Sequence, residues 1–290
     1  MFSRYLRGLG PLEVIKRSVK DFIDDEMPTY SAALAFQMFF SLFPFLIFLI
    51  ALLSFLDLQN FFEWLRQQAA LLLPQQAMDE VNAAIDKIME QKSGLFSMAI
   101  IVALWTASSG VRSAMDAMNK AYDVEEGRPA WKRFPLSIVY TVGIALMLLM
   151  AAGFMIIGPE VMNWLAHYLG LEQLMVVIWA WVRWPVAVLL LIMALALVYY
   201  VVPDVKQRFR FITPGSVLAV LVWIVASLGF GFYVKNFGKY DAMYGSIGAI
   251  IVLLLYFYIS AAVLLMGAEL NAVIEHHHPE GKDPGEKTPP

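Results

Sequence analysis

The sequence predicts an all-α integral membrane protein, a polytopic bundle of six transmembrane helices. Six segments of 19 to 30 residues contain no Asp, Glu, Lys or Arg: 27–56, 93–111, 134–159, 184–203, 211–234 and 242–268. A helix needs roughly 20 apolar residues to cross the hydrocarbon core, because it rises about 1.5 Å per residue. The composition agrees, with 60% hydrophobic residues and a mean hydropathy of +0.66. The segments are continuously apolar and do not alternate, which favours helices over a β-barrel.

The spans and their short connectors occupy most of the chain, so we expect one membrane domain over residues 30–272. Its spans are expected at about 30–56, 93–115, 134–159, 184–203, 211–234 and 242–268. An N-terminal segment, residues 1–29, precedes this domain. The tail, residues 273–290, is rich in His, Pro and charged residues and is expected to be disordered.

The distribution of Lys and Arg indicates the orientation of the bundle. The N-terminal segment, the loops after spans two and four, and the tail together carry 15 of the 21 Lys and Arg residues. The other loops carry six. Both termini are therefore expected in the cytoplasm.

Two segments outside the spans have amphipathic helical patterns. In residues 11–26, apolar side chains recur at helical spacing opposite Lys16, Lys20 and Asp24, which predicts an interfacial helix lying on the headgroups. In residues 57–92, an aromatic start and apolar positions after Pro74 predict one or two helices on the outer surface. A structural cap is the favoured role for this outer segment, with a binding site as the alternative.

Polar residues within span one form the first candidate site. Gln37 and Ser41 are four residues apart and therefore share a helix face. Pro44 removes a backbone donor and frees a carbonyl one turn earlier, so a kink is expected. Two interpretations remain open, a kink satisfied by Ser41 and a neighbouring helix, or a discontinuity that lines a cavity.

The second candidate site is at the end of span two. Arg112 and Asp116 are four residues apart and are predicted to pair, with Asn119 about one turn further on. A structural ion pair is the simpler interpretation. The alternative is a contact between Arg112 and an anion or lipid headgroup, because a guanidinium matches the geometry of phosphate oxygens.

The final third of the chain supplies the remaining candidates. Tyr244 and Gly245 open span six, where glycine allows close helix packing, and Glu269 and Asn271 lie at its inner end. Arg183 stands among three tryptophans before span four, which is typical of an outer interfacial belt. No metal or cofactor is expected. The chain has no cysteine, and its histidines are His167 and three in the tail.

The order and spacing of several motifs resemble the YihY/BrkB family of bacterial inner-membrane proteins over about residues 20–275. These motifs are Ala32-Ala33-Leu34-Ala35-Phe36, Phe40-Ser41-Leu42-Phe43-Pro44, Asn119 near Tyr122, Val202-Pro203, Pro214-Gly215, Tyr244-Gly245-Ser246-Ile247-Gly248 and Gly267-Ala268-Glu269-Leu270-Asn271. The resemblance implies a six-span protein of the bacterial cytoplasmic membrane. It implies no settled activity, because the family has carried both a serum-resistance label and the label ribonuclease BN, which we regard as a misassignment. For some relatives it suggests export of envelope lipid or of a lipopolysaccharide precursor.

The residues themselves disfavour a nuclease and leave two hypotheses. Phosphodiester hydrolysis by metal ions needs clustered His and carboxylate ligands, and RNA binding needs a large basic surface. The first hypothesis is a transporter or lipid-translocating protein that binds membrane lipids, such as anionic phospholipid or a lipopolysaccharide precursor. The chain lacks the Gly-x-x-x-x-Gly-Lys-Ser/Thr loop, so this transport would proceed without an ATPase of that type. The second is a non-transporting scaffold or envelope-stress factor. Neither hypothesis predicts enzyme activity or nucleic acid as a partner.

Overall fold

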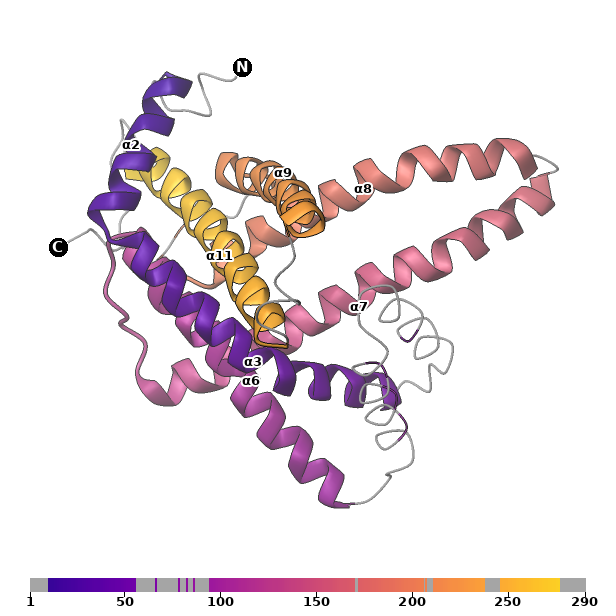
Figure 1. Cartoon of the computed structure of the whole chain (residues 1–290), viewed down its shortest axis with the longest axis horizontal. Coiled ribbons are helices and arrows are strands. Elements are labelled where there is room, and N and C mark those ends of the chain that lie inside the picture. Colours follow the sequence, from indigo (N-terminus) through magenta and orange to yellow (C-terminus); the bar gives the residue numbers. More distant parts are fainter. Residues whose placement is uncertain are drawn as a thin grey trace. The chain divides into compact units, whose positions relative to one another are not determined.

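The computed structural model describes residues 10–55, 66, 78, 82, 86, 94–169, 172–205, 207, 211–237 and 246–276. These residues form helices and no strand, which confirms the all-α prediction (Figure 1). The helices are α2 (Pro11–Asp24), α3 (Met27–Phe55), α6 (Gly94–Ala121), α7 (Ala130–Leu169), α8 (Glu172–Val201), α9 (Pro214–Phe237) and α11 (Ser246–His276). The chain divides into two compact units, residues 40–110 and the remainder. Most of the predicted outer segment 57–92 lies outside the described residues, as do residues 277–290 of the tail. The expectation of disorder from residue 273 is wrong for residues 273–276, which are the last turn of α11 and bury Val273 and Ile274.

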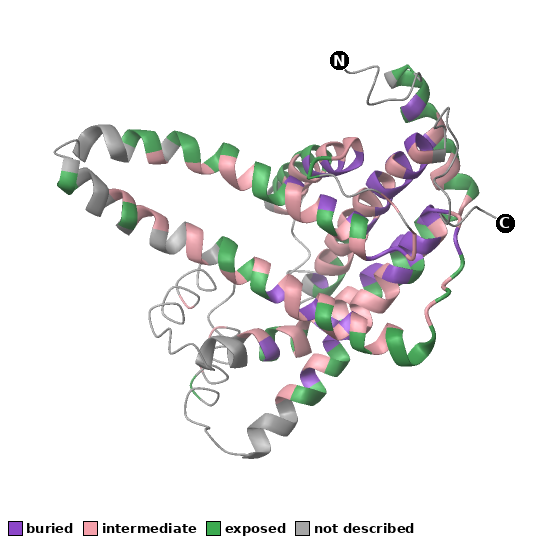
Figure 2. Cartoon of the chain, turned by 180° about the vertical axis from the view of Figure 1, so that it is seen from behind, coloured by how far each residue is buried: buried purple, intermediate pink, exposed green. Residues whose placement is uncertain are grey.

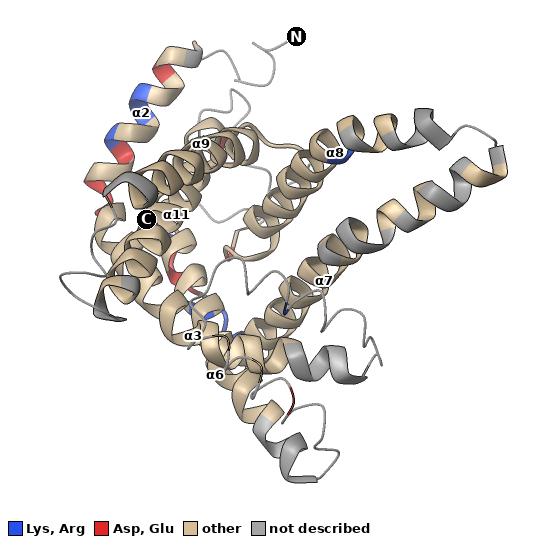
Figure 3. Ribbon diagram, turned by 45° about the vertical axis from the view of Figure 1, so that its right-hand side comes forward, with Lys and Arg blue, Asp and Glu red and all other residues tan. Residues whose placement is uncertain are grey.

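Among the residues that the structure describes, five helices are long and apolar enough to cross a membrane: α3, α7, α8, α9 and α11. In hydrocarbon each backbone N–H and C=O needs an internal partner, and a helix supplies one for almost every residue. Figure 3 shows charged positions along α2 and long uncharged stretches in α9 and α11. The predicted second span, residues 93–115, overlaps α6 from residue 94 onward. Because α6 is not among these five helices, the sixth crossing stays a prediction.

Helices α7 and α8 are longer than the spans predicted for them. α7 continues ten residues beyond the predicted end at residue 159, and α8 begins twelve residues before the predicted start at residue 184. Pro159 and Pro185 lie within these helices, which continue through both prolines. The two helices contact each other, and exposed positions recur along them (Figure 2). Most of the predicted connection between spans three and four is thus helical.

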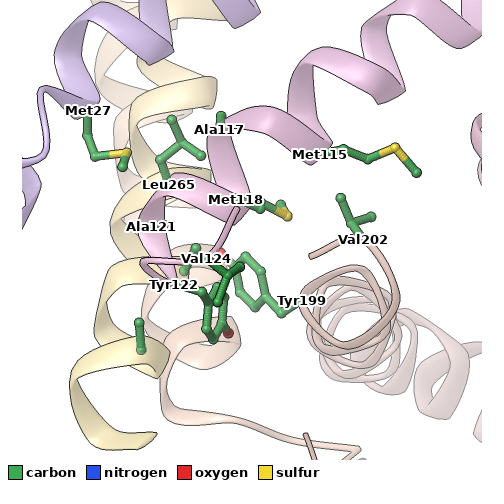
Figure 4. Close-up of a cluster of buried hydrophobic side chains, with 12 residues drawn as sticks. Met27, Met115, Ala117, Met118, Ala121, Tyr122, Val124, Tyr199, Val202 and Leu265 are labelled. Carbon is green, nitrogen blue, oxygen red and sulfur yellow. The ribbon is translucent and has the colours of Figure 1, made fainter. Parts of the chain in front are cut away.

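The remainder of the larger unit is organised around α11, which contacts both α9 and α2, while α8 contacts α9. A buried cluster joins the start of α3, the end of α6, the end of α8 and α11. Figure 4 shows Met27, Met118, Tyr122, Tyr199 and Leu265 in this cluster. The cluster fixes the ends of four helices that are far apart in sequence, because each contributes a side chain that is almost wholly inaccessible.

Helix α2, which ends at Asp24, confirms the predicted helix in residues 11–26, and its apolar face is partly buried. Val14 is 1% exposed and packs against the C-terminal end of α11. Ser18 donates to the carbonyl of Val14 and is also buried. The rest of the apolar face is exposed, at Leu12, Ile15, Val19 and Ile23. Contact between this face and headgroups remains a prediction.

Candidate functional site

The predicted site residues lie on three helices. Gln37, Ser41 and Pro44 lie on α3, where Ser41 is buried and the helix continues through Pro44. Arg112, Asp116 and Asn119 lie on the last turns of α6, and Glu269 and Asn271 lie near the end of α11. Tyr244 and Gly245 lie outside the described residues.

Asn119 is the centre of a polar cluster that the structure assembles after the end of α6. Its side chain is 3% exposed. The Asn119 Oδ1 accepts a hydrogen bond from the backbone N–H of Asp204 at 2.7 Å. Its Nδ2 donates to Oε2 of Glu126 at 3.0 Å. One amide therefore joins α6, the loop before α7 and the turn after α8, using both its donor and its acceptor.

Glu126 and Arg128 form the ion pair at the core of this cluster. The Arg128 Nε donates to Glu126 Oε1 at 2.6 Å, and its Nη2 donates to Oε2 at 2.7 Å, a bidentate geometry. The Arg128 Nη2 also donates to the carbonyl of Val202 at 3.1 Å. Asp204 completes the arrangement, with its Oδ2 accepting from the N–H of Gly127 at 2.9 Å. The loop before α7 is thus fastened to the turn after α8.

Arg133 connects this cluster to the face of α6. Its Nη2 donates to Asp116 Oδ1 at 2.6 Å and to the carbonyl of Arg112 at 3.1 Å. Its Nε lies 3.7 Å from Glu126 Oε2. Together we call Asp116, Asn119, Glu126, Arg128, Arg133 and Asp204 the charged network.

The partner of Asp116 therefore differs from the one predicted. Asp116 accepts from Arg133, whereas Arg112 donates from Nη1 to Ser137 Oγ at 3.1 Å and stacks over the Phe134 ring at 4.8 Å. Helical spacing alone favoured Arg112 as the partner of Asp116. The first turns of α7 offer a closer cation to Asp116 and separate partners to Arg112, which only the tertiary contact could reveal.

Asn271 belongs to a second group of contacts, at the start of α9. Its Oδ1 accepts from the N–H of Gly215 at 2.9 Å, and its Nδ2 donates to Thr213 Oγ1 at 3.1 Å. Thr213 and Ser216 also bond reciprocally, each side-chain oxygen accepting the other's backbone N–H at 3.1 Å. This satisfies N–H groups that a helix start leaves unpaired. Asn271 thus caps α9 from α11.

The helices α9 and α11 approach closely at the same place. A β-carbon added to Gly215 would lie 2.1 Å from the carbonyl oxygen of Gly267. One added to Gly267 would lie 2.2 Å from the hydroxyl oxygen of Tyr199 and 2.8 Å from the β-carbon of Ala219. Close packing through glycine was predicted at the other end of span six, at Gly245, which lies outside the described residues, so that expectation stays a prediction. The backbones can approach this closely because neither glycine carries a side chain.

Three further groups lie beside these clusters, and two of them, Tyr122 and Glu269, are buried. Tyr122 is 1% exposed, and burial raises the pKa of its hydroxyl far above the ordinary value of 10, so the group stays protonated. Lys120 bonds Asp25 at 2.7 Å, which raises the pKa of the Lys120 ammonium. Glu269 is 2% exposed, and its Oε1 has no hydrogen-bond partner among the described residues.

Glu126 gives the charged network a defined pH dependence. Burial opposes ionisation of its carboxyl, but the hydrogen bonds from Arg128 outweigh burial and lower the pKa of Glu126 below its ordinary value of 4.5. A lowered pKa adds stability that is present above the unfolded value and is lost as the pH falls through the folded value.

We therefore expect the melting temperature of the purified protein to fall on acidification below about pH 4.5, the ordinary Glu value. Glu126→Gln removes this titration and should flatten the acid side of a plot of melting temperature against pH. Glu13→Gln is the matched control, because Glu13 pairs with Arg17 on the exposed surface of α2. If the melting temperature of Glu126→Gln falls as steeply with acidification as that of the wild type, Glu126 is not the group that causes the loss of stability.

Two groups of residues in these clusters were not predicted as site residues. Glu126, Arg128 and Arg133 come from the connection before α7 and its first turn, and Asp204 follows the Val202-Pro203 motif. The charged stretch 123–128, which follows Asn119 closely, could have been noticed in the sequence. The sequence does not show that this stretch pairs with the turn after α8. Within the part of the chain that the structure describes, no group of three or more His, Asp or Glu side chains could hold a metal ion.

The chain is similar to known proteins over most of its length. A family model described as Virulence factor BrkB matches residues 18–290. The chain belongs to this family. The match confirms the resemblance, and it places the charged network, the α9–α11 contact and nearly all of the described helices within the family region.

Individual relatives of this BrkB-family protein carry uninformative names. YfkH of Bacillus subtilis, named as ribonuclease-like, is 37% identical over 247 residues, covering 84% of this chain and 88% of that protein. A UPF0761 membrane protein of Xanthomonas campestris is 30% identical over 263 residues, and one of Tolumonas auensis is 25% identical over 255. Each covers 86% of this chain, which spans 57% of the Xanthomonas protein and 81% of the Tolumonas protein. No solved structure matches.

Proposed function

We propose that this BrkB-family protein moves a lipid or lipid-like anion across the bacterial cytoplasmic membrane without an ATPase of its own. In this proposal six spans cross the membrane, both termini are cytoplasmic, and the charged network lies at the cytoplasmic end. Anionic phospholipid and a lipopolysaccharide precursor are the candidate substrates.

The observation that carries the proposal is the charged network itself. It joins α6, α7 and the turn after α8 through ion pairs, with the Glu126 and Arg128 side chains 17% and 14% exposed. Buried ion pairs contribute little stability compared with apolar residues of the same size. They can, however, exchange partners, and Arg133 already contacts both Asp116 and Glu126. This supports a contact that opens and closes during transport.

Reconstitution into liposomes tests the proposal. A fluorescent phospholipid in the inner leaflet should reach an external quencher faster with protein than without it. The chain contains no cysteine, so a thiol reagent would react only with the two introduced cysteines. Joining Asp116→Cys to Arg133→Cys with a reducible bifunctional thiol reagent should stop the movement, and reduction should restore it. A rate equal to that of protein-free liposomes would refute lipid transport.

A matched control uses two cysteines on one helix. Glu13→Cys and Arg17→Cys pair across a single turn of α2, so cross-linking them joins no second element. Transport should be unchanged by that reaction. If both cross-links slow the movement equally, the charged network is not the moving contact.

One observation favours the alternative, a non-transporting scaffold. Asn119 uses both groups of its amide within the network, as expected of a permanent structural contact. A scaffold predicts no lipid movement in any variant. It also predicts that the Asp116–Arg133 cross-link leaves the function of the protein in cells unchanged.

A further inference from the structure

Two arginines contact the same place, where α6 meets the first turns of α7. Arg112 comes from α6 and Arg133 from α7, and Arg112 Nη1 donates to Ser137, which lies one helical turn beyond Arg133. Arg133 donates to the backbone carbonyl of Arg112. Two like charges repel each other, so an anion that contacts both guanidinium groups would be stabilised by both.

The Arg112 side chain is held in place before any anion arrives. Its Nη1 donates to Ser137, and its guanidinium stacks over the ring of Phe134. A side chain that is already ordered loses less conformational entropy on binding. Guanidinium groups also match phosphate oxygens in a planar, bidentate geometry. Preorganisation and charge thus both favour a phosphate ligand here.

The position of the pair indicates a lipid as the source of that phosphate. The candidate span of α7 begins at Ala130, so Arg133 lies in its first turn. The neighbouring Trp131 is 70% exposed, and Lys132 lies over its ring at 5.0 Å. Exposed tryptophan and basic side chains at the start of a span are typical of the headgroup level of a bilayer.

Asp116 is the opposing charge at this site. It accepts from Arg133 at 2.6 Å, and its side chain is 52% exposed. A carboxylate in this position competes with an incoming phosphate for the same guanidinium. Its removal should therefore strengthen anion binding, a sign opposite to that expected for loss of Arg112.

We propose that Arg112 and Arg133 form a binding site for the phosphate of an anionic lipid headgroup, with Asp116 as the competing internal anion. The site requires only binding, so it can be present whether or not the protein transports lipid. Its test reads bound lipid and is independent of the transport assay.

The experiment is a lipid titration of the full chain in detergent, with bound lipid counted by native mass spectrometry. Phosphatidylglycerol is the anionic probe and phosphatidylcholine the zwitterionic one. Arg112→Gln should weaken phosphatidylglycerol binding about tenfold, the effect of losing one charge-assisted contact, and phosphatidylcholine binding less. Asp116→Asn should tighten phosphatidylglycerol binding. Arg112→Lys keeps the positive charge but loses the planar guanidinium that can make two parallel hydrogen bonds to phosphate. Its affinity for phosphatidylglycerol should lie between those of wild type and Arg112→Gln.

Arg183→Gln is the matched control, because Arg183 also stacks on an aromatic ring, that of Trp184 at 5.3 Å, on a different helix. Equal weakening by Arg183→Gln and Arg112→Gln would overturn the site, as would weaker binding in Asp116→Asn. Inorganic phosphate at millimolar concentration is the second arm. If it displaces phosphatidylglycerol completely, a soluble phosphate is the ligand and the lipid assignment is wrong. If Arg112→Gln does not fold, phosphatidylglycerol binding by Asp116→Asn and Arg112→Lys still tests the proposed site.

Discussion

Replacing Arg128 with methionine is expected to lower the free energy of unfolding by about 3 kcal/mol or more. The substitution leaves Glu126 mostly buried without its bidentate partner, and a carboxylate in that position keeps its desolvation cost but loses the compensating charge. It also leaves the carbonyl of Val202 without the Arg128 donor. Both effects act on the contact between the loop before α7 and the turn after α8.

Thermal unfolding in detergent, followed by the fraction that remains monodisperse, measures this loss. Lys20→Met is the matched control, since Lys20 and Asp24 are 75% and 61% exposed and lie 3.7 Å apart. Exposed pairs of this kind contribute about 1 kcal/mol at most. Adding Glu126→Gln to Arg128→Met should recover part of the loss, because the stranded charge is then absent. Equal melting temperatures for Arg128→Met and Lys20→Met would contradict a structural role for the buried pair.

Gly267→Ala is expected to produce the second large loss, about 1–3 kcal/mol from overpacking. The new methyl group would meet the hydroxyl of Tyr199 and the side chain of Ala219 at the α9–α11 contact. The Tyr199 hydroxyl donates to the carbonyl of Leu264 at 2.8 Å, so displacing it endangers a further hydrogen bond. Gly215→Ala should act in the same direction, because its β-carbon would meet backbone and Asn271.

The control for this prediction is a glycine whose replacement by alanine should not lower the free energy of unfolding. Gly231 lies within α9 with nothing within 4 Å of an added β-carbon. Alanine there should be neutral or stabilise by up to about 1 kcal/mol, because glycine weakens a helix interior. Melting temperatures of the glycine variants in one detergent compare them directly. If Gly267→Ala and Gly231→Ala have the same melting temperature, the close approach of α9 and α11 does not limit the stability of the protein.

The secondary structure was predictable because the membrane removes the alternatives. A charge-free apolar segment in hydrocarbon must satisfy its backbone internally, and this selects helices from local sequence alone. The boundaries of α7 and α8 were harder to predict from the sequence. Their ends carry polar and aromatic residues that a hydropathy pattern assigns to a connection, while the two helices support each other through mutual contact.

The candidate site was predictable in part. Arg112, Asp116 and Asn119 were identified because polar groups near a bilayer are costly and therefore noticeable. Their partners were not, since Glu126, Arg128 and Asp204 lie in connections where charge is ordinary. The spacing of Arg112 and Asp116 even favoured a pair that the tertiary structure replaces with Asp116 and Arg133.

The sequence by itself determined the all-helical class, the positions of the apolar segments and membership of the BrkB family. Each of these depends on local composition or on motif order along the chain. The tertiary structure alone decided that Asn119 joins α6 to the turn after α8, that Asn271 caps α9, and that Gly215 meets Gly267. These contacts join residues that are 52 to 85 positions apart in the sequence. No periodicity encodes such contacts, because they depend on which helices pack together and how closely.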